Sequence, residues 1–410
     1  MTALDDARPA GPPRQPVTTF LLPVEPPLDG SQAAELARRV FFVAESILDF
    51  RLVGEDRITG IEVTATAGTD PAELARKLAV VVANDLARQE AFTPKVVWRL
   101  DTEGTPSDVF DELTATGAAI PAGAGQVAFG EPLLSLTDHL DQRVRALVAA
   151  EFDAAEFRYP TLIATDVMRR SGYFSSFPQL MMFVSRLHSD VDVYQDFLHG
   201  LSAGTDLTDL LRAGAATVDH CLPPTMCYHS FAQLADSTLP AGSSVLTSRG
   251  KSFRFESRYE RSLERLWDFT IREIVFLGPR RTVLAQRARL MELTFELMAE
   301  LGLGGRCEVA SDPFFINTDT ADQVWNQRFL ELKYELRLPL EGERDVAVCS
   351  FNFHDRFFGK AFAIGAGDGA GPVHTACAGF GLERLAYAFL CRHGVDPAGW
   401  PEQVRRAVGS

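Results

Sequence analysis

In residues 253–278, apolar and polar positions alternate with a period of two on both sides of a charged loop. This alternation is typical of strands, because successive side chains of a strand point to opposite faces. The loop contains the charged residues Arg258, Glu260, Arg261, Glu264 and Arg265. We therefore predict two antiparallel strands joined by a charged loop that grips a ligand, although an ordinary amphipathic hairpin with a solvated loop has the same pattern.

Each predicted strand carries polar groups on a defined face. Arg254 and Glu256 are two positions apart, which puts a cation and a hydrogen-bond acceptor on the same face of the first strand. Such a pair suits a nucleotide, with phosphate on the guanidinium and the adenine amino group near the carboxylate. In the second strand Glu273 shares its face with apolar residues, and a buried carboxylate without a partner is costly. Glu273 therefore needs a cation, and a metal ion would serve.

Alternating strand and helix patterns fill the first hundred residues. The expected strands lie at 18–24, 49–53, 57–65 and 95–100, and the expected helices at 31–46 and 71–88. Asp70 before Pro71 is a strong helix start, because aspartate caps backbone N–H groups and proline fits the first helical position. The order β-α-β-β-α-β predicts a small ferredoxin-like domain over residues 17–100. Packing, dimerisation and partner binding are all compatible with this domain.

The segments around this domain differ from it in composition. Residues 1–16 are rich in proline and glycine and lack periodicity, which predicts a disordered tail. Residues 101–125 end in the glycine- and alanine-rich run TGAAIPAGAG and are expected to be a linker. Residues 126–410 would then form a second, larger domain.

Two further segments add candidate chemistry. A long helical pattern from Leu133 to about Ala150 is followed by an extended piece that ends at Tyr159-Pro160. Near the C-terminus the chain reads CAGFGLER over residues 377–384 and continues as an apolar helix. The two glycines allow a tight passage from strand to helix. Arg384 falls in the first helical turn, where an arginine can hold a terminal phosphate.

The net charge narrows the choice of partners. The 410 residues carry a formal charge of −15, which argues against a broad electrostatic grip on nucleic acid. No run approaches the roughly 18 apolar residues of a membrane span, and the N-terminus lacks a basic-then-apolar signal. We therefore expect a cytoplasmic protein without a membrane partner. The six cysteines are expected to be buried or to bind metal rather than to form a disulfide framework.

Three motifs follow one another in a fixed order. They are a helix that leads to a proline, an Arg-x-Glu hairpin with Phe269 and Glu273, and a Gly-x-Gly-x-x-Arg segment. This order resembles the signature motifs of class II aminoacyl-tRNA synthetases. Within that class the chain resembles the zinc-dependent atypical (methanogen-type) seryl-tRNA synthetases and, more closely, the amino acid:[carrier protein] ligases. The segments that match the ligases are SGYFSSFPQL at 171–180, TMCYHSF at 225–231, SDPFF at 311–315, CSFNFH at 349–354 and HTACAGFG at 374–381.

The resemblance covers roughly residues 126–410 and implies an α+β fold in which helices flank an antiparallel sheet. It also implies a homodimer whose interface contains the helix at 133–150. The implied activity is ATP-dependent activation of a small amino acid (glycine, alanine or serine-like) as an aminoacyl-adenylate, followed by transfer to the phosphopantetheine thiol of a carrier protein. One alternative is a zinc-dependent atypical seryl-tRNA synthetase. The other is a catalytically silent paralogue that binds a ligand and regulates a partner.

Cys227, Glu273 and Cys377 match the zinc ligands of these enzymes, and the resemblance implies that the substrate amino group fills the fourth position. Their spacings of 46 and 104 residues are too long for a local metal clip, so only the fold can bring them together. Three protein ligands are typical of a catalytic zinc site with one open position. Cys221, six residues before Cys227, is the rival ligand.

The resemblance also assigns an ATP site. It places Arg254 on the α-phosphate, Glu256 on the adenine amino group, Phe269 on the adenine ring and Arg384 on the γ-phosphate. The candidate Mg²⁺ ligands lie between the hairpin and the last motif, and they are Glu335, Ser350 and Asn352. The alternation around Glu335 equally suits an ordinary half-buried strand.

The helix predicted over residues 282–301 is basic near its start. Arg280 and Arg281 stand beside its start, and Arg287 and Arg289 lie within it. These four arginines are candidates for contact with an acidic carrier protein. A solvated helix face is the alternative. Residues 17–100 hold nine basic and twelve acidic side chains, so tRNA is not expected as a partner. Three histidines are expected near the site as core or hydrogen-bonding residues, namely His229, His354 and His374.

Overall fold

The computed structural model describes residues 16–86, 94–258, 262–310, 330–367, 369 and 371–408. The tail predicted at residues 1–16 therefore lies outside the described residues, apart from its last position. The described chain divides into two compact units, one before residue 87 and one after residue 93.

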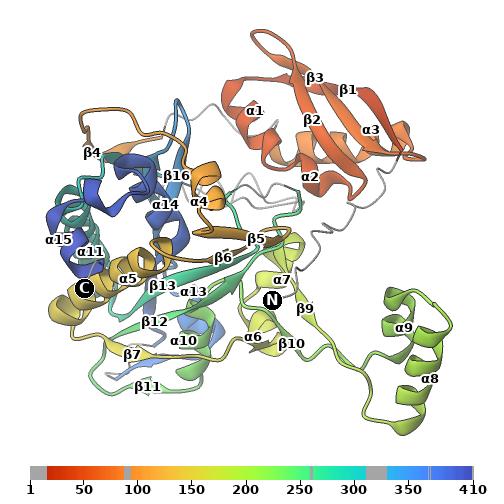
Figure 1. Cartoon of the computed structure of the whole chain (residues 1–410). Coiled ribbons are helices and arrows are strands. Elements are labelled where there is room, and N and C mark those ends of the chain that lie inside the picture. Colours follow the sequence, from red (N-terminus) through yellow and green to blue (C-terminus); the bar gives the residue numbers. More distant parts are fainter. Residues whose placement is uncertain are drawn as a thin grey trace, which may run out of the picture. The chain divides into compact units, whose positions relative to one another are not determined.

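The first unit is a small antiparallel sheet with helices packed on it (Figure 1). Its strands are β1 (Val17–Leu28), β2 (Ile47–Val53) and β3 (Ile58–Thr66), in the order β1-β3-β2. Its helices are α1 (Gly30–Ala37), α2 (Val40–Val43) and α3 (Pro71–Val81). The cap predicted for α3 is confirmed, because Asp70 accepts a hydrogen bond from the Ala72 N–H at 2.9 Å. The single helix predicted at 31–46 is wrong, since a turn separates α1 from α2.

The fourth strand predicted for this small sheet belongs elsewhere. Residues Val96–Leu100 do form a strand, β4, but it pairs with β14 (Gly305–Val309) of the second unit. The Trp98 ring stacks on Phe295 of helix α11, with ring centres 4.7 Å apart. The prediction of a complete βαββαβ sheet is therefore wrong, because the apolar face of this strand finds its partner in the second unit.

An eight-stranded sheet forms the centre of the second unit, which confirms the expected α+β architecture with a largely antiparallel sheet. Its order is β4-β14-β15-β16-β18-β13-β12-β7, and only the β12–β7 pair is parallel. Besides β4 and β14 the strands are β15 (Lys333–Pro339), β16 (Asp345–Phe353), β18 (His374–Gly381), β13 (Asp268–Gly278), β12 (Ser244–Phe253) and β7 (Ala155–Phe157).

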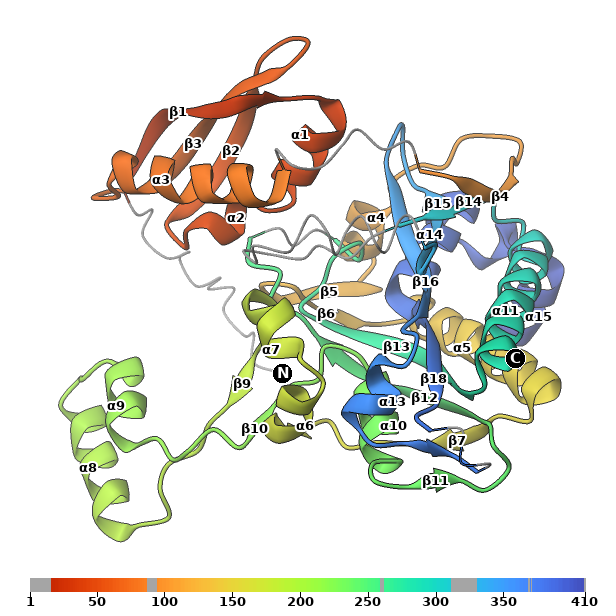
Figure 2. The ribbon, with the colours of Figure 1, turned by 180° about the vertical axis from the view of Figure 1, so that it is seen from behind.

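Helices cover both faces of this sheet (Figure 2). One face packs against α5 (Leu133–Phe152), α11 (Arg280–Glu300) and α14 (Leu382–His393). On that face Arg272 of β13 binds Asp141 of α5 with N–O distances of 2.7 and 2.8 Å. The opposite face packs against α10 (Cys227–Gln233) and α13 (Phe357–Ala361). Because β13 is central and covered on both sides, it is apolar at most positions, and its polar residues stand out as functional or structural exceptions.

The prediction of a linker over residues 101–125 is wrong for most of this segment. It contains α4 (Phe110–Ala115) and β5 (Ala119–Gly123), and β5 pairs with β6 (Gln126–Phe129). Leu113 is fully buried. Gly125 lies so close to Trp267 that a Cβ atom there would be 2.4 Å from the indole ring. At Gly125, therefore, the glycine permits close packing and is not a sign of flexibility.

The other α-helices and strands among the described residues are β8 (Ile163–Ala164), α6 (Thr165–Arg170), α7 (Tyr173–Ser176), β9 (Phe183–Val184), α8 (Val191–Ser202), α9 (Leu207–Gly214), β10 (His220–Cys221), β11 (Thr238–Leu239), β17 (Gly365–Ala366) and α15 (Glu402–Val408). Short helical turns of other types lie at Val82–Leu86, Pro178–Leu180 and Pro397–Gly399. Among the helices that the structure describes, none combines the length and the apolar composition that crossing a membrane requires.

Candidate metal and nucleotide site

The predicted hairpin is confirmed as the antiparallel pair β12–β13, in which Phe253 lies opposite Asp268. The first strand ends at Phe253. Arg254 and Glu256 were predicted within this strand, but they lie just after it. The Arg254 N–H still donates to the carbonyl of Trp267, but the Phe255 N–H donates to the carbonyl of Leu180, which is distant in the sequence. Both functional side chains are therefore presented by the connection between the strands.

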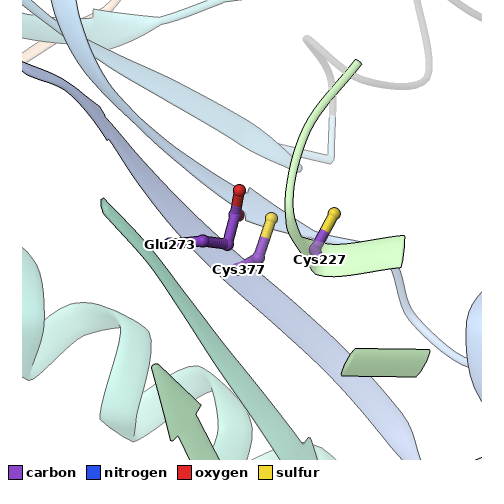
Figure 3. A group of neighbouring side chains, drawn as sticks. All are labelled: Cys227, Glu273 and Cys377. Carbon is purple, nitrogen blue, oxygen red and sulfur yellow. The ribbon is translucent and has the colours of Figure 1, made fainter. Parts of the chain in front are cut away.

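Cys227, Glu273 and Cys377 converge on one point of the sheet. Their ligand atoms all lie within 4.8 Å of one another, and all three residues are buried. Figure 3 shows the three side chains next to one another. Glu273 comes from β13, Cys377 from the neighbouring strand β18, and Cys227 from the first turn of α10. Gly379 lies directly opposite Glu273, and a Cβ atom there would be 2.7 Å from the Ile271 side chain and 3.5 Å from Oε2 of Glu273.

The chemistry of this group suits a soft divalent cation. Burial raises the pKa of Glu273 to about 7, although the hydrogen bond from Thr225 Oγ1 at 2.5 Å lowers it. The pKa of the Cys227 thiol is also raised by burial. The pKa of Cys377 is raised by its hydrogen bond with Cys227 and by burial. Two thiols and a carboxylate that are costly to ionise alone fit a zinc ion, which accepts this donor set with one position left open.

Further polar groups contact the sulfur of Cys377. The amide nitrogen of Asn352 lies 3.6 Å from Sγ, and Nε2 of His354 lies at the same distance. The rival ligand Cys221 is not in the group, because its thiol lies 3.7 Å from the carbonyl oxygen of Ile163. The histidine expected as a hydrogen-bonding neighbour of the site is therefore His354.

The other two histidines lie in different surroundings. His229 stacks on the ring of Tyr159, with centres 5.3 Å apart, and burial lowers its pKa to about 4. His374 lies 3.3 Å from Asp355 and stacks on Phe353. Both histidine rings are therefore packed on aromatic rings, and His374 has the carboxylate of Asp355 as a polar neighbour as well.

The predicted ATP residues lie beside one another. The guanidinium carbon of Arg254 is 5.4 Å from the centre of the Phe269 ring, and its Nε donates to the carbonyl of Pro224. Glu256 is buried and accepts a hydrogen bond from Arg265 at 2.9 Å. A ring and a cation held face to face suit an adenine and its phosphates.

Arg384 lies in the first turn of α14, as predicted, and it is held by backbone oxygens. It donates to the carbonyls of Glu264 at 2.6 Å and Ala347 at 3.1 Å. Its pKa is lowered to about 10, chiefly by burial and then by the charge of Arg265. Sequence reasoning missed Arg265 as a member of this group. Arg265 could have been found from its position at the end of the charged loop, four residues before Phe269.

The three candidate Mg²⁺ ligands share one face of the sheet but differ in their contacts. Glu335 and Ser350 are directly opposite each other on β15 and β16. Glu335 forms ion pairs with Lys333 at 3.2 Å and with Arg337 at 2.7 Å. Asn352 lies opposite Cys377 and therefore next to the candidate metal group. The structure thus separates Asn352 from Glu335 and leaves Ser350 between them.

Comparison with known proteins shows two ligases of Bradyrhizobium diazoefficiens. Amino acid–[acyl-carrier-protein] ligase 1 is 33% identical over 279 residues, which span 67% of this chain and 83% of that protein. Ligase 2 is 33% identical over 317 residues, which span 75% and 90% of the two chains. This chain belongs to the amino acid–[acyl-carrier-protein] ligase family. The resemblance inferred from the three motifs is therefore confirmed, although the sequence matches no family model.

The more distant similarities of this ligase are to serine–tRNA ligases. The type-2 serine–tRNA ligase of Methanothermobacter thermautotrophicus is 27% identical over 295 residues, which span 70% of this chain but 56% of that enzyme. The crystal structure of M. kandleri SerRS in complex with A. aeolicus tRNASec has a TM-score of 0.70 at 22% identity, covering 96% of this chain and 77% of that one. Seryl-tRNA synthetase from Pyrococcus horikoshii, complexed with ATP, has a TM-score of 0.54 at 15% identity, covering 75% and 64%. These structures confirm the class II fold.

The four arginines predicted to contact a carrier protein differ in their exposure and in their partners. Arg280 and Arg281 are exposed at the start of α11. Arg287 is partly buried, donates to the carbonyls of Glu331 and Leu332, and lies over the Tyr334 ring at 5.1 Å. Arg289 is paired with Glu151 of α5 at 2.9 Å. The expected cluster of four therefore reduces to two exposed arginines.

Helix α11 and the metal group lie on opposite faces of the sheet. Arg287 of α11 lies over Phe353, whereas the preceding residue, Asn352, contacts Cys377. Neighbouring residues of a strand point to opposite faces. A carrier protein that bound at α11 would therefore have to extend its thiol around the end of the sheet to reach the site.

A buried carboxylate that sequence reasoning missed also supports the site. Both oxygens of Glu383 accept hydrogen bonds from the Thr270 N–H, at 2.7 and 2.8 Å. Glu383 precedes Arg384, and Thr270 follows Phe269. This contact ties the start of α14 to the strand that carries Phe269.

Proposed function

We propose that this ligase activates a small amino acid (glycine, alanine or serine-like) with ATP as an aminoacyl-adenylate. It then transfers the aminoacyl group to the phosphopantetheine thiol of a carrier protein, where a thioester forms and AMP leaves. The observation that carries the proposal is the presence of two groups in one chain. The first is Cys227, Glu273 and Cys377, and the second is the cluster of Arg254, Arg265 and Arg384, whose charges suit the phosphates of a nucleotide. Membership of a family whose curated relatives are named amino acid–[acyl-carrier-protein] ligases supports it.

Cys227, Glu273 and Cys377 would hold a zinc ion, and bound zinc supplies an open position that a neutral amino group can fill. Thr225 fixes one oxygen of Glu273 by its 2.5 Å hydrogen bond. Asn352 donates to the sulfur of Cys377 at 3.6 Å, which stabilises negative charge on that sulfur. Both contacts hold their side chains in place before any ligand enters.

The nucleotide residues would act by position and charge. The substrate carboxylate attacks the α-phosphorus of ATP, an acyl–phosphate bond forms, and pyrophosphate leaves with its electron pair. Arg254 and Arg384 would stabilise the charge on the phosphate oxygens, while Phe269 stacks on adenine. Two N–H groups of the Arg384 guanidinium engage backbone carbonyls, which leaves up to three of its five for phosphate.

Arg265 is the third cation that we assign to the triphosphate. It lies close enough to Arg384 for their repulsion to lower the pKa of Arg384. Like charges at such a distance are unfavourable without an anion between them. The carboxylate of Glu256, 2.9 Å from Arg265, partly compensates in the absence of ATP.

Mg²⁺ that accompanies ATP would find hard oxygen ligands in the cross-strand pair Glu335 and Ser350. Glu335 would then exchange part of its pairing with Lys333 and Arg337 for the ion. Asn352 is the third candidate from the sequence, but its contact with Cys377 favours a role at the zinc site.

The test is amino-acid-dependent exchange of pyrophosphate into ATP, measured across the small amino acids. The acceptor is then tested with holo carrier protein, where a covalent mass increase that hydroxylamine removes identifies a thioester. Absence of exchange with every amino acid would contradict adenylation and favour the silent paralogue. Adenylation followed by charging of tRNA alone, with every holo carrier protein unmodified, would establish the synthetase instead. The formal charge of −15 argues against that second outcome, because tRNA binding depends on phosphate neutralisation.

A further inference from the structure

Arg344 joins two carboxylates that are far apart in the sequence. It lies just before β16, and its Nη2 donates to Asp108 Oδ2 at 2.7 Å. Its Nη1 donates to Glu264 Oε1, also at 2.7 Å. A weaker contact to Glu341, at 3.3 Å, is local to the same turn. Asp108 comes from the segment that the sequence suggested was a linker, and Glu264 precedes Arg265 in the loop between β12 and β13.

These contacts close into a ring on helix α14. The Tyr387 hydroxyl donates to Asp108 Oδ1 at 2.5 Å. At the other end of the ring, the carbonyl of Glu264 accepts the 2.6 Å hydrogen bond from Arg384. Tyr387 and Arg384 lie three residues apart on α14 and so on neighbouring positions of its surface. The loop residue Glu264 is thus held twice, through its side chain by Arg344 and through its backbone by Arg384.

An ordinary surface ion pair does not explain this arrangement. Exposed pairs contribute about 0–1 kcal/mol and tolerate many geometries. The Arg344 and Glu264 side chains are 25% and 14% exposed, and one guanidinium uses separate nitrogens for two carboxylates. A planar guanidinium with fixed donor directions specifies the positions of both partners, whereas an ammonium group would not.

We propose that Arg344, anchored by Asp108, is a positioning residue that sets the loop carrying Glu264 and Arg265 against Arg384, so that these arginines meet the triphosphate of ATP. The inference rests on the proposed adenylation. Arg344 itself touches no reacting group. Its effect is therefore expected on ATP and pyrophosphate and not on the amino acid.

The test uses the full-length chain with Arg344→Gln, which keeps a polar, unbranched side chain but removes the charge and the guanidinium fork. The KM for ATP in pyrophosphate exchange is expected to rise about tenfold or more, because small displacements of positioning groups cost up to about a hundredfold. The KM for the amino acid is expected to stay within about twofold. Arg344→Lys, which can hold one carboxylate firmly, is expected to fall between Gln and wild type.

A double-mutant cycle tests the anchor. Asp108→Asn retains the hydrogen bond to the Phe110 N–H but loses the charge that faces Arg344. If both residues act through one ring, the double variant Asp108→Asn/Arg344→Gln is expected to be no worse than the more damaging single variant. Effects that simply add would contradict a shared role.

Arg170→Gln is the matched control. Arg170 is 34% exposed and holds Asp236 through two hydrogen bonds of 2.8 and 3.0 Å, so it loses comparable contacts. It is expected to leave both KM values unchanged. An unchanged KM for ATP in Arg344→Gln would overturn the inference, as would an equal rise in both KM values together with a lower melting temperature.

Direct titration with ATP separates this inference from the proposed function. If the wild-type chain binds ATP but shows no exchange, adenylation fails while the weaker ATP binding expected of Arg344→Gln is still measurable. Equal ATP affinity of wild type and Arg344→Gln in that titration would refute the positioning role, whatever the activity.

Discussion

The ligand assignment at the candidate metal site depends on which of two nearby cysteines binds. We expect Cys227→Ser to lose most of the bound zinc and with it adenylate formation, because a hydroxyl is a poor replacement for a soft thiolate. Cys221→Ser is the control, since its thiol lies beside the carbonyl of Ile163 and outside the group. Metal content by mass spectrometry of the purified proteins decides the matter. Full zinc in Cys227→Ser with loss in Cys221→Ser would reverse the assignment.

Arg384 contacts two backbone carbonyls, and we propose that it also binds phosphate, so one substitution would remove both interactions. Arg384→Ala is expected to slow pyrophosphate exchange about 10² to 10³-fold, the usual cost of losing a transition-state donor. The structure adds a stability cost of about 1–3 kcal/mol, because the carbonyls of Glu264 and Ala347 lose their donor in a buried place. Denaturant unfolding measures that cost, and exchange at the wild-type rate would exclude the phosphate role.

At the residue scale, the sequence located the site better than it described the contacts. Spacings of 46 and 104 residues carry no geometric information, so the convergence of Cys227, Glu273 and Cys377 was predictable only from the order of the motifs. The burial of Arg287 was in principle predictable. It lies four positions after Val283 and three before Leu290, on the buried stripe of α11.

At the scale of elements, periodicity identified strands and helices but not their partners. The strand at Val96–Leu100 was expected correctly as a strand and wrongly in the N-terminal sheet. Alternation specifies a half-buried face and not the surface that buries it. The face of this strand is buried by Phe295, almost two hundred residues away, on which Trp98 stacks. The strand therefore joins the large sheet of the second unit. In the same way, the glycine-rich run that ends at Gly125 indicated flexibility, and only the neighbouring Trp267 shows that Gly125 permits close packing.

Two arginines, Arg280 and Arg281, are exposed at the start of α11. We expect Arg280→Glu/Arg281→Glu to weaken transfer to a holo carrier protein severalfold or more while adenylate formation is unchanged, because like charges would repel the acidic partner. The matched control is Arg405→Glu/Arg406→Glu, two adjacent exposed arginines on α15. Transfer rates at several salt concentrations measure the effect. Equal transfer by both double variants would place the carrier protein elsewhere on the ligase.

For the whole molecule, the contacts of β4 and Gly125 move the domain boundary. A chain that starts at residue 94 is expected to retain pyrophosphate exchange, since it keeps β4 and the whole large sheet. A chain that starts at residue 126, the boundary suggested by composition, is expected to lose activity. It lacks β4, Asp108 and the Gly125 carbonyl that accepts from the Trp267 N–H at 2.8 Å. Activity and circular dichroism of the two chains test this, and an active shorter chain would contradict it.

We also expect a homodimer, from the resemblance that places the helix at 133–150 in a subunit interface. In the structure this helix, α5, buries one apolar stripe within its own unit, and Leu134 on it is 43% exposed. Sedimentation over micromolar concentrations measures the mass. A monomer throughout that range would show that the interface of the synthetase class is absent in this chain.

The candidate metal group draws its three side chains from α10, β13 and β18, which are brought together only in the folded chain. An ion held by all three would bind the native state and not the unfolded one. Mass action then adds about 4 kcal/mol of stability at a free metal concentration a thousandfold above the dissociation constant. The supply of zinc would thus affect the fraction of this enzyme that is folded in a cell, in addition to the activity of each molecule.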